Sequence, residues 1–403
     1  MQHLCKDVAR HIFDLLPEET NAAERKRLFK HGERSHYQPR LNAMMKCAES
    51  EPQIDAKPTD FDRDEWLLNV ANGTIDLREG ELLTHSELDM ITKLAPVKFD
   101  PSAECPRFQK FLDRIFRGQP DLIRFLQRLF GYALTGAGKE RFFFIFYGNG
   151  RNGKTTLLEA FRHVMGDYAG TIPIAALMKS RNANNSAPTP EIASLRGKRF
   201  VTSSEVEDGQ RLGESLIKQL TGNGKVVARA LYQGMTEFNT TFKLFLDCNY
   251  KPAIRGGDDA IWDRTVLIPF NERIEDDEVD TDLLEKLKDE APGILAWAMR
   301  GCLQYQEDGL KQPKEVEAAV HEFRNDSDIF GRFVAEYCVP HSGAEVSFEN
   351  LYAEFSSFCK KDLRWKEPAT ENKLSREMKR KGFTRVKKGG RAYLVGLGLR
   401  SEI

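Results

Sequence analysis

The sequence RFFFIFYGNGRNGKTTLLEAF at residues 141–161 decides the fold. Its first part is an aromatic and apolar run too short to cross a membrane, which predicts a buried central strand. The run ends at Gly148, where a G-x-x-x-x-G-K-[ST] pattern begins that includes Gly153, Lys154 and Thr155. Apolar residues then recur at helical spacing to the end of the stretch. A strand, a glycine-rich loop and a helix in this order are typical of a phosphate-binding loop.

The residue types in this loop suit the binding of a polyphosphate. Glycine lacks a Cβ, so the backbone can take positive φ angles, approach phosphates closely and turn its N–H groups inward at the start of a helix. Lys154 would reach the β- and γ-phosphates of ATP, and the hydroxyl of Thr155 would bind Mg²⁺. The predicted nucleotide-binding residues are Gly148, Asn149, Gly150, Arg151, Asn152, Gly153, Lys154, Thr155 and Thr156. The alternative is a glycine-rich turn before an ordinary helix, which the flanking strand and helix disfavour.

Length and composition indicate a globular protein of several domains. The 403 residues are enough for about two to four domains, and the hydrophobic fraction of 40% is ample for sizeable cores. No run of about 18 uninterrupted apolar residues occurs, and the first residues carry charges where a signal peptide would need an apolar centre. We therefore expect a cytoplasmic protein without membrane contact. The seven cysteines and eight histidines are dispersed, which predicts neither a disulfide framework nor a metal site built from them.

Charge is distributed unevenly along the chain although the formal net charge is only −1. Residues 360–403 hold 14 Lys and Arg against 5 Asp and Glu, an excess of nine positive charges. Such an asymmetry indicates contact with nucleic acid. On charge alone, a solvated charged face explains it equally well.

Helical patterns flank a small β element before the phosphate loop. Residues 1–57 read as helices that end in a proline-containing linker. Asn72-Gly73 stands between two alternating apolar runs and predicts a β-hairpin. Apolar residues return to helical spacing from Pro106 to Gly131, which predicts a helical collar that leads into the strand before the loop.

Strands after the loop end in polar residues. The run 198–207 ends in acids, and a carboxylate there would hold Mg²⁺ through water and polarise the attacking water. We assign this role to Glu205, with Glu207 as the alternative for part of it; solvated acids after an edge strand are the structural alternative. The run 241–249 ends on Asn249, whose amide can hydrogen-bond a γ-phosphate or the lytic water.

A fourth strand is predicted at 264–270. Strands that alternate with helices around one phosphate loop predict an α/β fold with a mostly parallel sheet. In such a sheet the ligand lies at the carboxyl ends of the strands.

Several short motifs follow the phosphate loop in a fixed order. They are KQLTG at 218–222, ARALY at 228–232, the strand that ends on Asn249, Asp263-Arg264, and Ile268-Pro269-Phe270. This order resembles that of superfamily III helicases, and it is closest to the primase-helicase family of phages, plasmids and poxviruses. The runs 68–77, 99–106 and 126–135 resemble the helical domain that precedes the ATPase in that family. The resemblance covers about residues 62–270.

The resemblance implies an AAA+ ATPase that assembles as a homo-oligomeric ring, commonly a hexamer, around single-stranded DNA. Asn249 would be the sensor at the end of its strand. Arg264 stands where the family carries its arginine finger, which would enter a neighbouring subunit's site and supply charge to the transition state. Arg255 could take this role instead, and an arginine that caps an edge strand is the structural alternative. The implied catalytic residues are Lys154, Glu205, Asn249 and Arg264, with ATP and Mg²⁺ as cofactors and Thr155 and Glu205 at the metal.

The family places a hairpin that projects into the ring channel between the acidic strand and Asn249. Here that hairpin would be residues 226–238. Tyr232 near its tip could stack on a base, and Lys225 and Arg229 could meet phosphates. This chain departs from the family because no lysine occupies the expected tip, so a structural hairpin without DNA contact is an equal alternative.

The C-terminal part predicts a second DNA-binding element. An acidic helical lid follows the core, and then three helices at 329–337, 348–358 and 370–381 precede a hairpin that turns at Gly389-Gly390. This order is typical of a winged helix. Its predicted phosphate contacts are Arg376, Lys379, Arg380, Lys387 and Lys388. The alternative is an interface with another subunit or a partner.

The family often carries an N-terminal primase-polymerase domain, but nothing before Asp62 resembles one. Five segments are expected: a helical segment at 1–62, a mostly helical collar domain with a small hairpin at 63–138, the AAA+ core at 139–272, a helical lid at 273–327 and a winged-helix domain at 328–403. The chain is then either a helicase alone or the C-terminal part of a longer polypeptide. Primase activity is not predicted, although a primase or polymerase could act with the chain in cis or in trans.

These observations predict an ATP-dependent DNA helicase of phage, plasmid or virus-type replication, which works on forks as a ring. The resemblance implies movement from 3′ to 5′. One alternative is an AAA+ initiator or loader without processive unwinding. Another is a DNA-binding adaptor whose bound ATP only sets its oligomeric state.

Overall fold

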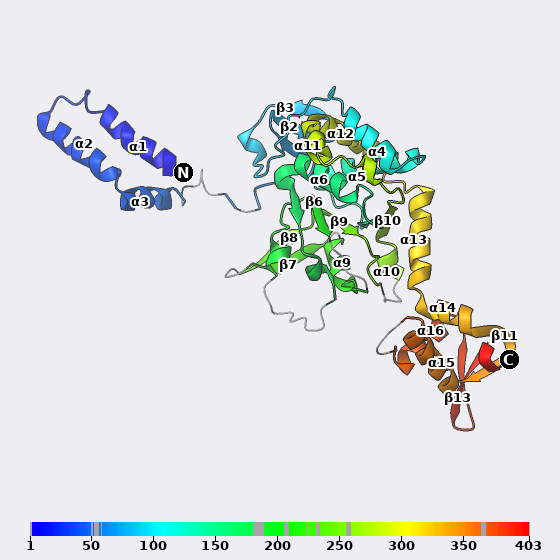
Figure 1. The fold of residues 1–403 in the computed structure, drawn as a ribbon. Helices are drawn as coiled ribbons and strands as arrows, with labels where there is room; N and C mark the ends of the chain where they lie inside the picture. Colours follow the sequence, from blue (N-terminus) through cyan, green and yellow to red (C-terminus); the bar gives the residue numbers. More distant parts are fainter. Residues whose placement is uncertain are drawn as a thin grey trace. The chain divides into compact units, whose positions relative to one another are not determined.

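The computed structural model describes residues 2–49, 51, 56–57, 59–179, 189–204, 209–222, 224–230, 234–254, 259–363 and 368–402. The chain forms two compact units, Met1–Arg63 and Asp64–Ile403. The first unit contains α1 (Gln2–Asp14), α2 (Ala22–Ser35) and α3 (Gln38–Ala48), drawn in blue in Figure 1. A small core of Cys5, Ala9 and Leu41 joins α1 to α3.

The second unit opens with a three-stranded antiparallel sheet. Its strands are β1 (Leu67–Val70), β2 (Gly73–Asp76) and β3 (Glu81–Leu83). The predicted hairpin is confirmed, but Val70 pairs with Gly73, so the turn is Ala71-Asn72 rather than Asn72-Gly73. The one-residue difference has a steric cause, because a Cβ at Gly73 would lie 2.3 Å from the carbonyl oxygen of Leu83. The third strand therefore needs glycine inside the sheet, where the sequence pattern had placed it in the turn.

A layer of helices covers one face of the central sheet. It contains α4 (Pro106–Ile115), α5 (Pro120–Leu134), α6 (Lys154–Met165), α11 (Leu283–Asp289) and α12 (Ala291–Asp308), which lie together in the upper part of Figure 1. Helices α5 and α12 approach closely because glycines face the partner backbone. A Cβ at Gly131 would lie 2.1 Å from the backbone nitrogen of Cys302, and one at Gly301 would lie 1.9 Å from the carbonyl oxygen of Gln127.

The central sheet has five parallel strands in the order β10-β4-β9-β6-β5. The strands are β4 (Phe143–Tyr147), β5 (Ala169–Thr171), β6 (Phe200–Ser204), β9 (Lys243–Cys248) and β10 (Thr265–Pro269). A parallel sheet at this place in the chain confirms the predicted α/β fold, and four of its strands lie within the predicted runs. The sequence pattern did not indicate β5. The phosphate-loop strand β4 lies between the central strand β9 and the edge strand β10, so the loop emerges one strand from the edge of the sheet.

Alternate side chains of β4 enter two different cores, as expected for a strand buried on both faces. Phe144 and Phe146 pack with the helical layer described above. Phe143 and Ile145 pack on the other face, against α7 (Ile174–Leu177), α8 (Pro190–Ala193), α9 (Glu214–Leu220), α10 (Asp259–Trp262) and α13 (Lys314–Ser327).

The predicted hairpin before Asn249 is present as β7 (Lys225–Arg229) and β8 (Met235–Asn239). One face of this two-stranded sheet packs into the core that contains Phe143 and Ile145. The side chains that enter this core are Val226, Ala228 and Phe238. Val227 and Met235 lie on its exposed face. The hairpin is thus anchored by one face to the side of the sheet opposite α5 and α12.

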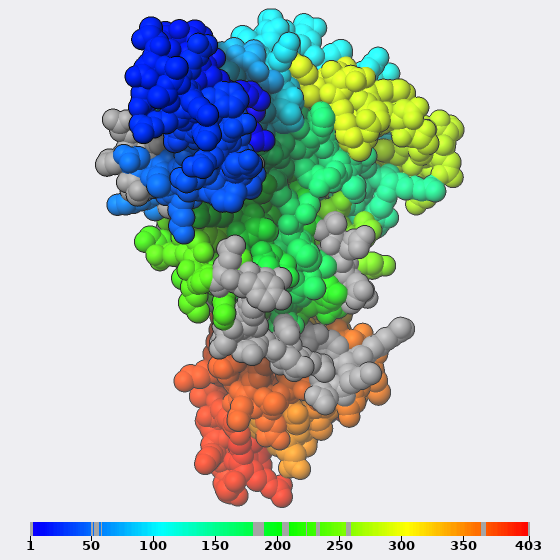
Figure 2. Space-filling view, turned by 90° about the vertical axis from the view of Figure 1, so that its left-hand side faces the viewer, coloured from blue at the N-terminus to red at the C-terminus, as the bar shows by residue number. Residues whose placement is uncertain are grey.

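Residues 329–402 have a hydrophobic core of their own. The elements are α14 (Ile329–Tyr337), β11 (Cys338–Ser347), α15 (Phe348–Lys361), α16 (Glu371–Arg380), β12 (Thr384–Lys388) and β13 (Arg391–Leu399), with the sheet order β11-β13-β12. Figure 2 shows the surface of this C-terminal domain in orange and red. The three predicted helices and the turn at Gly389-Gly390 are confirmed, whereas the sequence pattern did not indicate the long strand β11.

Two buried cations attach the helical layer to the amino ends of the central strands. Arg199, just before β6, donates to the carbonyl oxygens of Leu134 (2.6 Å) and Leu67 (2.7 Å). Lys243, the first residue of β9, donates to the carbonyl oxygen of Thr135 at 2.6 Å. Burial, together with the neighbouring Arg199 charge, holds the pKa of Lys243 well below its ordinary range. The carbonyls at the C-terminal end of α5, which have no partner within a helix, are satisfied in this way.

Candidate nucleotide-binding site

The loop from β4 to α6 takes a conformation that requires glycine at two positions. A Cβ at Gly148 would lie 2.2 Å from Nδ2 of Asn152 and 2.4 Å from the carbonyl oxygen of Phe270. Gly153 has φ of +81°, and a Cβ there would lie 2.8 Å from Ile115. Gly150 also has a positive φ of +84° but faces open space. The glycine spacing that defined the motif thus follows from close packing at its two ends.

Lys154, the first residue of α6, is buried with only 3% of its surface exposed. Its Nζ donates to the carbonyl oxygen of Gly148 at 2.8 Å, to Oδ1 of Asn152 at 2.9 Å and to Oδ1 of Asn249 at 3.2 Å. Burial lowers the pKa of Lys154, while the carboxylate of Asp247 opposes this shift. The lysine and the amide that the sequence separates by 95 positions therefore meet at the loop.

Thr155 follows at the second position of α6 and is exposed. Its hydroxyl donates to Oδ2 of Asp247 at 2.6 Å. The other carboxylate oxygen of Asp247 lies 3.9 Å from Nζ of Lys154. Asp247 lies within the predicted strand 241–249, and the sequence pattern assigns it no role. The signal that could have identified it is a single carboxylate in an otherwise apolar strand, two residues before Asn249.

A cavity of about 420 Å³ opens beside this cluster, and its walls come from α6, β6, β9 and the segment around β5. Thr155, Asp247 and Ser203 line it. Ser203 is 3% exposed, and its Oγ has no hydrogen-bond partner among the residues that the structure describes. The cavity therefore has polar groups at the carboxyl end of the sheet, where parallel α/β folds bind ligands.

The oxygen atoms at this cavity suit magnesium. Mg²⁺ is held by one or two carboxylates, retained waters and the phosphates of the substrate, rather than by a cage of protein ligands. Thr155 Oγ1 and the carboxylate of Asp247 are such hard oxygen ligands. Within the described ranges, no group of three or more His, Cys, Asp and Glu side chains could hold a metal ion.

The remaining predicted loop residues lie at the loop but have different surroundings. Asn152 is buried, and its Nδ2 donates to the carbonyl oxygen of Phe270 at 3.3 Å. Arg151 has φ of +50° and pairs with Asp276. Asn149 is exposed, and Thr156 is half-buried.

Arg264 does not join this cluster within its own chain. It precedes β10, whose first residue pairs with the first residue of β4, so it lies at the amino end of the sheet, opposite the loop. Its Nη1 donates to Oγ1 of Thr221 at 3.2 Å. A role for Arg264 in catalysis would therefore require a second copy of the chain. Four other predicted site residues, Glu205, Glu207, Tyr232 and Arg255, lie outside the described residues.

The predicted DNA contacts differ in their present partners. Lys225 pairs with Glu237 across the hairpin at 3.2 Å, whereas Arg229 is exposed. In the C-terminal domain, Arg376, Lys379 and Lys387 are exposed, and Lys388 pairs with Glu345.

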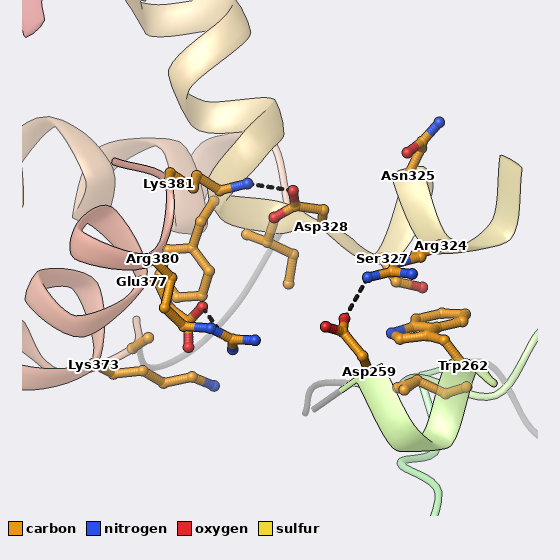
Figure 3. Close-up of a pocket in the computed structure, with 14 residues that line it drawn as sticks. Asp259, Trp262, Arg324, Asn325, Ser327, Asp328, Lys373, Glu377, Arg380 and Lys381 are labelled. Carbon is orange, nitrogen blue, oxygen red and sulfur yellow. Dashed lines mark hydrogen bonds and ion pairs between the residues drawn. The ribbon is translucent and has the colours of Figure 1, made fainter. Parts of the chain in front are cut away.

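Arg380 lines a pocket of about 350 Å³ between α10, the end of α13 and α16 (Figure 3). Several basic groups of this pocket are neutralised by acids. Arg380 pairs with Glu377 at 3.4 Å, and the pairs Arg324–Asp259 and Lys381–Asp328 join different elements (Figure 3). The predicted phosphate contacts on α16 are thus divided between this pocket and the open surface.

Comparison with known proteins adds two domain matches. Residues 1–117 match a family described as "D5 N terminal like", and residues 146–264 match a family of unknown function. "Putative helicase L207/L206" of Acanthamoeba polyphaga mimivirus is 29% identical over 76% of this chain and 34% of its own length. "Putative primase C962R" of African swine fever virus is 27% identical over 51% of this chain and 22% of its own length.

Residues 1–117 are thus similar to the D5 N-terminal family, and longer parts of the chain are similar to viral proteins named helicase and primase. The chain matches about a third or less of the length of either viral relative. A solved structure of the NrS-1 C-terminal region aligns with 75% of this chain and with 78% of its own chain, at 15% sequence identity. Its TM-score of 0.44 is too low to establish a shared fold.

Across the described residues, no helix has both the length and the apolar character needed to span a membrane.

Proposed function

We propose that this chain is the helicase part of a D5-like primase-helicase and unwinds duplex DNA with energy from ATP. It would act as an AAA+ ring, commonly hexameric, around single-stranded DNA at replication forks. The parallel order β10-β4-β9-β6-β5, with the phosphate-loop strand β4 between the edge strand β10 and the central strand β9, supports the AAA+ assignment. The names of the viral relatives support a role in replication.

The observation that carries the proposal is the burial of Lys154 beside Asn249. A cationic side chain is costly to bury unless its charge has a partner. Here the ammonium is held by neutral oxygens of Gly148, Asn152 and Asn249, and Asp247 lies farther away at 3.9 Å. A polyphosphate is a partner that matches both the charge and the helix N-terminus at this position.

The residues of the chain would divide the chemistry among them. Lys154 and the loop N–H groups bind and orient the β- and γ-phosphates, and Asn249 positions the γ-phosphate or the attacking water. Magnesium held at Thr155 would neutralise charge that develops on the phosphate oxygens. Glu205, outside the described residues, would accept the proton of the attacking water.

Arg264 from a neighbouring subunit would complete the site. Arg264 lies at the amino end of the parallel strands, whereas the loop lies at their carboxyl end, so this role depends on ring assembly. An arginine supplied in trans can contribute about 10³–10⁵ in turnover. The hairpin β7–β8 and the exposed Arg376, Lys379 and Lys387 would contact DNA phosphates without sequence preference.

One experiment separates this function from its alternatives. ATP hydrolysis is measured with and without single-stranded DNA, together with strand displacement on forked substrates in which each tail is blocked in turn. Wild type and Lys154→Ala are compared, with Lys98→Ala as the control for loss of an exposed lysine elsewhere. We expect DNA-stimulated hydrolysis and displacement that Lys154→Ala abolishes and Lys98→Ala retains. Blocking the tail used for 3′ to 5′ movement should stop displacement.

Hydrolysis without displacement would contradict the helicase and favour the initiator or loader. ATP binding without any turnover would favour the adaptor. Turnover that Lys154→Ala retains would remove the phosphate loop from the reaction.

A further inference from the structure

Asp247 occupies an unusual position for a carboxylate. It is the fifth of six residues of β9, and the other five are buried in this central strand. Its register partners are Phe146 on β4 and Ser204 on β6, and its side chain is 13% exposed. A carboxylate is rarely placed so deep in a sheet unless it has specific partners.

The partners of Asp247 are the two side chains that the proposed function assigns to the metal and the phosphates. Thr155 donates its hydroxyl hydrogen to Asp247 at 2.6 Å, and Nζ of Lys154 lies 3.9 Å away. One carboxylate therefore touches the proposed metal ligand with one oxygen and faces the proposed phosphate ligand with the other. Binding of Mg²⁺ and ATP requires both contacts to be exchanged.

The charge of Asp247 opposes a polyphosphate that arrives without a cation. The γ-phosphate and the carboxylate would approach the same ammonium, and like charges at such distances repel strongly in a partly desolvated site. A divalent cation between them reverses the sign of this interaction, because it attracts both groups. The position of Asp247 thus makes the local charge balance depend on magnesium.

The cavity next to Asp247 offers room and a second polar group for the waters that magnesium retains. The buried hydroxyl of Ser203 lines the same cavity of about 420 Å³ and has no hydrogen-bond partner in the described part of the chain. A buried hydroxyl without a partner is costly, and ordered water can satisfy it. Ser203 is therefore a second observation, independent of Asp247, that points to bound solvent or a hydrated cation here.

We propose that Asp247 makes nucleotide binding depend on magnesium. Its carboxylate holds Thr155 and Lys154 as the structure shows, releases both to Mg²⁺ and the phosphates, and then accepts hydrogen bonds from the waters of the metal, together with Ser203. Binding of ATP without magnesium is disfavoured, because the negative charge of the carboxylate is then not compensated. This inference rests on the proposed function, because it assumes that the loop binds ATP.

The test is equilibrium binding of a fluorescent, non-hydrolysable ATP analogue to the full chain, in excess Mg²⁺ and in excess EDTA. Wild type is compared with Asp247→Asn, which preserves the shape of the side chain and removes its charge. The matched control is Glu159→Gln, which removes a charge from the wall of the same cavity, where Glu159 pairs with Arg162 at 3.0 Å. Asp247→Ser removes the same charge but introduces a different side chain. It shows whether an effect of Asp247→Asn comes from the loss of charge or from the asparagine itself.

We expect Asp247→Asn to bind the analogue in EDTA at least about tenfold more tightly than wild type, since tenfold corresponds to a small part of the cost of close like charges. Its affinity in Mg²⁺ should stay the same or fall. The ratio of the Kd in EDTA to the Kd in Mg²⁺ should therefore be smaller than in wild type. Asp247→Ser should shift the ratio in the same direction, whereas Glu159→Gln should keep the wild-type ratio. A purely structural role for Asp247 would weaken binding in both conditions and would not produce a gain in EDTA.

An unchanged ratio in Asp247→Asn and Asp247→Ser, with wild type binding the analogue, would overturn this inference alone. A wild-type chain that binds the analogue in neither condition would overturn the proposed function, and this inference with it.

Discussion

The ammonium of Lys154 donates a hydrogen bond to Oδ1 of Asn249 across 3.2 Å. This contact joins the first residue of α6 to the residue that follows β9. Asn249 is exposed, whereas Lys154 is buried, so this hydrogen bond links the buried lysine to the exposed side of the site. The pair therefore links the end of β9 to the start of the helix that follows the loop.

Asn249→Ala should separate binding from turnover. The variant keeps the loop and Lys154, so the affinity for ATP should change by less than about threefold, while hydrolysis should fall by about 10²-fold, as when one positioned polar group is removed from a transition state. Single-turnover hydrolysis and analogue binding measure the two quantities. Equal loss of affinity and turnover would mean that Asn249 only supports the loop.

Arg264→Ala should retain ATP binding and lose turnover, and it should poison wild-type subunits when the two are mixed. Its contact with Thr221 at 3.2 Å offers a matched control, because Thr221→Val breaks this hydrogen bond and keeps the arginine. The measurement is ATPase activity against the fraction of variant subunits. Two outcomes would show that Arg264 serves its own subunit. One is an equal loss of ATPase activity in Thr221→Val and Arg264→Ala, and the other is an activity of mixtures that falls in simple proportion to the fraction of variant subunits.

Gly131→Ala should destabilise the protein although alanine is the better helix former by about 1 kcal/mol. The added Cβ would meet the backbone of α12 at 2.1 Å, and overpacking of this kind costs about 1–3 kcal/mol. Thermal unfolding of the two proteins measures the difference. A Tm equal to or above that of wild type would show that α5 and α12 can separate without loss.

Acid should weaken the contact between α4 and the segment after the core. The Arg114 guanidinium lowers the pKa of Glu278 to about 2 from an ordinary value of 4.5. A lowered carboxyl pKa stabilises the fold above pH 4.5, and this contribution is lost as the pH falls from 4.5 towards 2. Urea unfolding of wild type and Glu278→Gln should therefore converge over this range. A constant difference between pH 5 and pH 3 would contradict this assignment.

The sequence predicted those parts of the site that a local pattern defines. Four sheet strands, the hairpins at Asn72-Gly73 and Gly389-Gly390 and the C-terminal helices follow from periodicity and turn residues, because each is specified by neighbours in the chain. The sequence also placed the loop and Asn249 at the carboxyl ends of parallel strands, and the structure adds a hydrogen bond from Lys154 to Asn249. Oligomeric state, nucleotide and DNA contacts remain predictions.

Other features escaped because they depend on residues distant in the sequence. The hairpin register depends on the approach of Leu83 to Gly73, and β5 is too short to show a period. The contact of Asp247 with Thr155 escaped because the two residues are 92 positions apart in the sequence. The pairing of Lys225 with Glu237 escaped because Glu237 lies on the opposite strand of the hairpin, 12 positions away.

Arg199 and Lys243 have a mechanical consequence. Each is buried and holds carbonyl oxygens at the end of α5 or in β1. If the helical layer tilted against the strands, both cations would lose these acceptors in a place that water does not reach, at a cost of several kcal/mol. The layer and the sheet should therefore move as one rigid body in the proposed ATP cycle, and in the proposed ring the movement would take place at the interfaces between subunits.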